Sequence, residues 1–175
     1  MAKSIAKKLA YVAVMTALLE CAKLALSLVP NVELVTLLCA IFGSVFGIWG
    51  VVASFVFVLV EFLIWGFGPW LISYAIHWPL VTMLFCLLNK TKWFNKYWAS
   101  GVAILCCIFF AVLTSLVDVG LFSGAFDDFF ARFTIYFMRG IVFYVVQIVC
   151  NAVVFLALFD LLKNLLIKIQ KTTFD

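Results

Sequence analysis

Apolar residues run along the chain in six long stretches separated by short breaks. The stretches cover about residues 8–29, 32–48, 50–67, 70–88, 98–120 and 132–162. A helix rises about 1.5 Å per residue, so about 20 residues cross a hydrocarbon core of ~30 Å. The stretches are continuous rather than alternating, which argues against the strands of a barrel. The pattern predicts six transmembrane helices, with a short second helix and a sixth that is long enough to continue as an amphipathic tail.

The breaks carry residues that favour turns. They are Pro30-Asn31, Gly47 to Gly50, Gly66-Phe67-Gly68-Pro69, Asn89 to Lys96, and Gly120 to Ala131, the last with Gly124, Asp127 and Asp128. None of them is long enough to be a linker between domains. We therefore expect residues 1–175 to form a single domain.

The composition explains why these helices belong in lipid. The chain is 68% hydrophobic and 11% charged, whereas soluble domains have about 25% charged residues. It has too little polar surface to cover itself in water. A net charge of +4, spread along the chain, gives no basis for nucleic-acid binding. We expect an all-α integral membrane protein with the bilayer as its main surroundings.

The basic residues predict the orientation of the helices, because cytoplasmic loops are enriched in Lys and Arg. If the N-terminus lies in the cytoplasm, so do nine of the twelve basic residues: Lys3, Lys7, Lys8, Lys90, Lys92, Lys96, Lys163, Lys168 and Lys171. The opposite orientation places all nine outside. We therefore expect both termini on the cytoplasmic side.

The outer half of the predicted bundle contains most of the remaining polar side chains. A charge at mid-bilayer costs at least about 2.5–3.5 kcal/mol, so such groups should face protein or a wet cavity. The candidate ligand-binding residues are Asn31, Glu33, Glu61, Trp65, Tyr74, His77, Trp78, Asp118, Arg139, Gln147 and Asn151. For two pairs, Glu20 with Lys23 and Gln147 with Asn151, mutual hydrogen bonding within the bundle is an equally good interpretation.

Residues 59–79 are unusually rich in aromatic and hydrogen-bonding side chains. Trp65 and Trp70 lie where membrane proteins carry an interfacial aromatic belt, which explains them without a ligand. His77 and Trp78 lie two turns farther into the fourth stretch, where that explanation is weaker. A flat aromatic face beside hydrogen-bonding groups suits a planar or heterocyclic ligand.

Two pairs of small residues four positions apart predict close helix approach. Ala13 and Ala17 lie in the cytoplasmic half of the first stretch, and Gly43 and Gly47 end the second. Packing within this chain is the simpler explanation for either pair.

The motifs of several enzyme classes are missing. The sequence contains no G-x-x-x-x-G-K-[ST], H-E-x-x-H or G-x-S-x-G pattern. Its six cysteines lie inside apolar stretches without a C-x-x-C, and His77 is the sole histidine, so we read the cysteines as small core residues. We expect no catalysis, no metal and no cofactor.

The chain as a whole resembles the substrate-binding S components of energy-coupling factor (ECF) transporters. The resemblance rests on size, six helices, Ala13-x-x-x-Ala17, the stretch Pro30 to Leu38, and Glu61-x-x-x-x-Gly66-Phe67-Gly68 before an aromatic helix. It implies a multi-pass protein of the prokaryotic cell membrane that captures a vitamin from outside. It also implies docking, through Ala13 and Ala17, on a transmembrane T subunit driven by two ATPase subunits.

The resemblance leaves the ligand open among cobalamin, riboflavin, pantothenate, folate, thiamine and a queuosine precursor. The Trp-rich rim favours a compound with rings, and a corrinoid is the first expectation. Two other functions fit the residues: a non-catalytic membrane protein with a structural or assembly role, and a secondary transporter that works alone.

Overall fold

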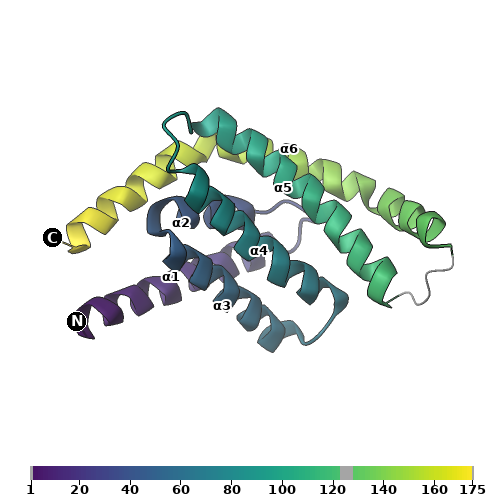
Figure 1. Ribbon diagram of the computed structural model, residues 1–175, viewed down its shortest axis with the longest axis horizontal. Coiled ribbons are helices and arrows are strands. Elements are labelled where there is room, and N and C mark those ends of the chain that lie inside the picture. Colours follow the sequence, from purple (N-terminus) through teal and green to yellow (C-terminus); the bar gives the residue numbers. More distant parts are fainter. Residues whose placement is uncertain (1, 123–127, 175) are drawn as a thin grey trace.

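The computed structural model describes residues 2–122 and 128–174, and every regular element in them is helical. The elements are α1 (Ala2–Leu26), α2 (Val35–Phe46), α3 (Ile48–Trp65), α4 (Pro69–Leu88), α5 (Lys96–Val117), the π-helical turn η1 (Asp118–Phe122) and α6 (Phe129–Phe174) (Figure 1). The predicted all-α fold is confirmed. Gly124 and Asp127, in the predicted fifth break, lie outside the described residues.

Five helices are long and apolar enough to cross a membrane: α1, α3, α4, α5 with its π-helical continuation, and α6. The chain is thus a multi-pass membrane protein. The sixth helix was expected to continue beyond its span as a tail, and α6 does so as one helix of 46 residues.

The second predicted span is shorter than the sequence indicated. Helix α2 has 12 residues and rises about 18 Å, which is less than a hydrocarbon core of ~30 Å. It starts at Val35 because Glu33 caps its N-terminus: the carboxylate accepts the Thr36 backbone N–H at 2.8 Å and the Thr36 hydroxyl at 2.5 Å. The preceding residues 27–34 form turns and irregular backbone.

Helix α2 and residues 27–34 together nevertheless connect the two ends of the bundle. Its C-terminal end reaches the level of the α4 C-terminus, where Asn89 donates from Nδ2 to the Ser44 carbonyl at 2.8 Å. The N-terminal end of α1 and the C-terminal end of α6 also lie at this end, which we call the terminal end (Figure 1). The α1–α2 and α3–α4 connections lie at the opposite end. Successive helices therefore alternate in direction.

The core sits around α2, which packs against α3, α4 and α6. Close approach to α4 depends on Gly43, because a Cβ built there would lie 2.1 Å from the Thr82 carbonyl oxygen. Nearer the terminal end, Phe85, Phe155 and Phe159 form a fully buried aromatic cluster. The apolar core thus fills the half of the bundle that holds the termini.

A polar clasp closes the terminal end. Lys163 of α6 donates to Oδ1 of Asn89, whose amide nitrogen holds the carbonyl of Ser44. The Lys163 ammonium also lies 5.7 Å from the ring centroid of Phe94 and 5.6 Å from that of Phe159. The clasp fixes α2, α4 and α6 relative to one another.

Candidate functional site

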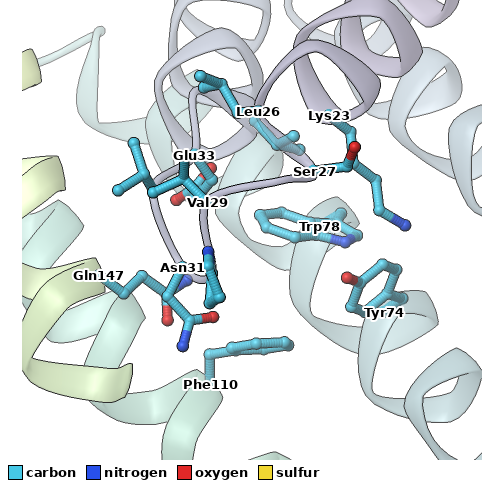
Figure 2. Close-up of a pocket in the computed structure, with 13 residues that line it drawn as sticks. Lys23, Leu26, Ser27, Val29, Asn31, Glu33, Tyr74, Trp78, Phe110 and Gln147 are labelled. Atoms are coloured by element: carbon cyan, nitrogen blue, oxygen red, sulfur yellow. The ribbon is translucent and has the colours of Figure 1, made fainter. Parts of the chain in front are cut away.

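A cavity of about 150 Å³ lies in the half of the bundle away from the terminal end. It is bounded by the C-terminal end of α1, by residues 27–34, and by α4, α5 and α6 (Figure 2). Its lining residues are Lys23, Leu26, Ser27, Val29, Pro30, Asn31, Val32, Glu33, Val35, Tyr74, Trp78, Phe110 and Gln147. Elements from both halves of the sequence meet here, so we take this cavity as the candidate site.

One wall of the cavity is aromatic. Tyr74 and Trp78 are one turn apart on α4, so both side chains leave the same helix face. Their ring centroids are 5.4 Å apart, and Phe110 of α5 lies 5.9 Å from Trp78 and 6.0 Å from Tyr74. Trp78 is 3% exposed, and its Nε1 has no hydrogen-bond partner in the described part of the chain. Since a buried indole N–H usually has a partner, this donor is left unsatisfied beside the cavity.

The other wall is polar. Asn31, Glu33 and Gln147 lie together across the cavity from Trp78 and Tyr74 (Figure 2). Asn31 has a backbone φ of 59°, a left-handed conformation that Asn tolerates better than most residues. Oε1 of Glu33 accepts from Nδ2 of Asn151 at 2.7 Å. The carboxylate is therefore held in place by neutral donors.

Lys23 ties the end of α1 to α3 and α4 at the cavity edge. Its ammonium forms an ion pair with Glu61, whose side chain is fully buried. The same ammonium lies 5.0, 5.6 and 6.0 Å from the ring centroids of Tyr74, Trp70 and Trp65. These distances are within the range of cation–π attraction. The rim aromatics thus surround a cation that belongs to the chain itself.

The structure corrects the predicted pairing of Glu20 with Lys23. Lys23 instead pairs with Glu61, 38 positions along the chain. Glu20 is buried beside that pair and interacts electrostatically with Glu61 and with Lys23. Two carboxyl groups therefore share one ammonium at this point.

The eleven predicted site residues fall into three groups. Those that line the cavity are Asn31, Glu33, Tyr74, Trp78 and Gln147. Two buried residues lie directly behind the lining: Glu61 holds Lys23, and Asn151 holds Glu33. Asn151 also donates to the main-chain carbonyl of Gln147 at 3.1 Å, so the predicted Gln147–Asn151 link runs through the backbone rather than between side chains.

The remaining four lie outside the cavity. Trp65 is 59% exposed and contacts Lys23 from the rim. Asp118 accepts from the Tyr136 hydroxyl at 2.8 Å, which ties η1 to α6, and Arg139 lies in shallow surface hollows beside Tyr136. The His77 ring packs against the rings of Trp78, Phe109 and Phe110, and is stacked on Phe109. It borders a separate apolar hollow of about 340 Å³ between α4 and α5.

Sequence reasoning missed eight of the thirteen lining residues, among them Lys23, Phe110 and Ser27. Lys23 was visible as a charge inside a span, but the nearby Glu20 offered it a local partner. Phe110 lies in an uninterrupted apolar stretch and carries no local signal. Ser27 precedes the Pro30 break, and its hydroxyl donates to the Leu24 carbonyl at 2.8 Å, as in many helix ends.

The two pairs of small residues have different roles in the fold. Gly43 is used within the chain, where it allows α2 to contact α4. Ala13 and Ala17 are exposed on α1, together with Ala6 and Ala10, and no other part of the described chain covers them. The simpler explanation, packing within this chain, is therefore wrong for Ala13 and Ala17. We call Ala6, Ala10, Ala13 and Ala17 the alanine face.

The chain has no significant match among protein-family models, curated proteins or solved structures. Within residues 2–122 and 128–174, no three His, Cys, Asp or Glu side chains come together as a metal site requires. The function is therefore argued from the cavity and from the alanine face.

Proposed function

We propose that this protein is the substrate-binding membrane subunit of an ECF-type importer, which captures a vitamin-like compound from outside the cell. Its partners would be a transmembrane T subunit and two ATPase subunits. In this proposal all six helices, with the short α2, cross the prokaryotic cell membrane, and both termini face the cytoplasm. The lysine distribution and the shared position of the two terminal helix ends support this orientation.

The observation that carries the proposal is the unpartnered indole of Trp78 in the wall of a cavity remote from the terminal end. A buried donor without a partner costs about 1–3 kcal/mol. A ligand in the cavity would recover that cost by placing a hydrogen-bond acceptor against this N–H.

The size of the cavity favours a small ligand. Sites for drug-sized molecules usually have about 300–1,000 Å³, and this cavity has about 150 Å³. A compound of one or two rings suits it better than a corrinoid, which was the first expectation from the sequence. Among the listed vitamins, thiamine and the queuosine precursor are the best candidates by size.

The alanine face supports the second half of the proposal. Small residues at i and i+4 allow another helix to approach closely in lipid. Ala13 and Ala17 remain uncovered in this chain, so the face is available to a helix of the T subunit. It lies on α1 toward the terminal end, away from the cavity.

Ligand-dependent stability of the purified protein tests the binding function. A ligand at 100 times its dissociation constant should stabilise the folded state by about 2.7 kcal/mol, which appears as a rise in the unfolding temperature. If none of the six candidate compounds named above raises that temperature, a structural or assembly role becomes the better explanation. Uptake of the vitamin in a host without T and ATPase subunits would instead support a transporter that works alone.

Co-purification tests the docking function separately. Ala13→Leu should prevent assembly with the T subunit and the ATPases while ligand binding is unchanged. Leu18→Phe is the matched control, because Leu18 is 44% exposed and lies about 110° around the same helix from the centre of the alanine face. Loss of assembly in both variants, or loss of ligand binding in Ala13→Leu, would contradict docking through the alanine face.

A further inference from the structure

The charged groups around the cavity are out of balance. Glu33 and Lys23 line the cavity, and the carboxyl groups of Glu61 and Glu20 lie behind the lining, beside the Lys23 ammonium. Farther out, the described residues Asp118, Asp128, Arg132 and Arg139 supply two charges of each sign and leave this sum unchanged. Even if Glu20 and Glu61 share one proton, one negative charge remains without a counter-charge.

That remaining charge belongs to Glu33. Its carboxylate accepts hydrogen bonds from Thr36 and Asn151, all of them from neutral donors. Lys23 does not neutralise it, because the Lys23 ammonium is paired with the fully buried Glu61. A carboxylate on a cavity wall within a membrane favours a positive charge beside it.

The wall that faces Glu33 is suited to a flat cation. Trp78, Tyr74 and Phe110 present their rings to the cavity (Figure 2), and aromatic faces attract cations. The rim already shows this property, since the Lys23 ammonium lies 5.0 Å from the Tyr74 ring centroid. The indole N–H of Trp78 adds a buried donor that has no partner in the described part of the chain, and an acceptor on the ligand would satisfy it.

We infer that the ligand is a planar nitrogen heterocycle that carries one positive charge and a hydrogen-bond acceptor. Glu33 binds the charge, the aromatic wall stacks on the ring, and Trp78 donates to the acceptor. This inference rests on the function proposed above and narrows its substrate class.

Pairs of compounds that differ mainly in charge test it. One pair is thiamine and its neutral isostere 3-deazathiamine, in which a carbon replaces the charged ring nitrogen; the other is the aminomethyl and the cyano form of the deazaguanine queuosine precursor. Folate and pantothenate serve as anions. Affinities for the purified full chain in detergent are measured by calorimetry. We expect the tightest ligand to be a cation, bound at least about tenfold more tightly than its neutral partner, because charges a few ångströms apart interact strongly at an effective dielectric constant of about 20.

Glu33→Gln provides the decisive variant. Gln retains an acceptor for Thr36. The ratio of the affinities for the cation and for its neutral partner, measured on one preparation, does not depend on the fraction of folded protein. The ratio should fall about tenfold, because only the cation loses its counter-charge. Asp118→Asn removes a carboxylate that lies outside the cavity and accepts from the Tyr136 hydroxyl, so it should keep the preference for the cation.

The outcomes separate the two proposals. Tightest binding of a neutral or anionic compound overturns the inference and leaves the binding function standing. A cation preference that survives Glu33→Gln overturns it as well. If no compound binds, and the chain does not assemble with a T subunit, the proposed function fails and the inference fails with it.

Discussion

Replacing Gly43 by Ala should destabilise the protein, because α2 and α4 touch at this residue. The added Cβ would lie 2.1 Å from the carbonyl oxygen of Thr82, 3.0 Å from its carbonyl carbon and 3.2 Å from the backbone nitrogen of Cys86. All three atoms belong to the backbone of α4, so no side chain can rotate away. The two helices must separate by roughly 1 Å, which loosens contacts that are otherwise close-packed.

The magnitude follows from two opposing effects. Overpacking of a core costs about 1–3 kcal/mol, and a backbone clash belongs at the upper end. Alanine in place of glycine inside a helix returns up to about 1 kcal/mol. We expect a net loss of about 2 kcal/mol in the free energy of unfolding.

Gly101→Ala is the matched control. Gly101 also lies inside a helix, α5, but a Cβ there would have no neighbour within 4 Å. This variant should gain up to about 1 kcal/mol, so the two variants should differ by about 3 kcal/mol. For a chain of this size that corresponds to about 6–12 °C in unfolding temperature.

Thermal unfolding of both variants in the same detergent measures the difference. Tryptophan fluorescence is a suitable signal, because Trp78 lies in the core. Equal unfolding temperatures for the two variants would refute the reasoning. It would mean that α2 does not approach α4 at Gly43.

Three further predictions concern the cavity. Lys23→Met should lower the free energy of unfolding by about 3–5 kcal/mol, because it leaves the buried Glu61 beside Glu20 without a cation. The double variant Lys23→Met/Glu61→Gln should lose less than Lys23→Met alone. If the losses of the two single variants simply add in a double-mutant cycle measured by chemical denaturation, the Lys23–Glu61 ion pair is contradicted. Asn151→Leu should lower stability by about 1–3 kcal/mol and weaken ligand binding, because Glu33 loses its donor; unchanged affinity would separate Glu33 from the site. Trp78→Phe should weaken binding about tenfold while His77→Phe leaves it unchanged, and a titration in which His77→Phe has the larger effect would place the ligand on the other side of Trp78.

The helices could be predicted from the sequence because their cause is local. Long apolar stretches in a chain with few charges indicate membrane helices wherever they occur. The start of α2 was misplaced because Glu33 was interpreted as a ligand-binding group alone. Its carboxylate in fact also caps the helix through Thr36, and a Glu placed before an apolar stretch does not show by itself which of these roles it has.

The cavity was only partly predictable because its walls come from distant parts of the chain. Asn31 and Gln147 are more than a hundred positions apart and share a wall. Lys23 offered two possible partners, and helical spacing favoured Glu20, three residues away, over Glu61. Glu61 lies 38 positions from Lys23 along the chain, and no rule based on neighbouring positions predicts a contact at that separation.

Helix α1 connects the two proposed surfaces mechanically. Ala13, on the alanine face, and Lys23, at the cavity edge, lie ten positions apart on one uninterrupted helix, a separation of about 15 Å. A tilt of about 10° with its pivot at Ala13 would move the Lys23 backbone by roughly 3 Å. We therefore expect a neighbour that tilts α1 from the alanine face to disturb the Lys23–Glu61 ion pair at the cavity edge.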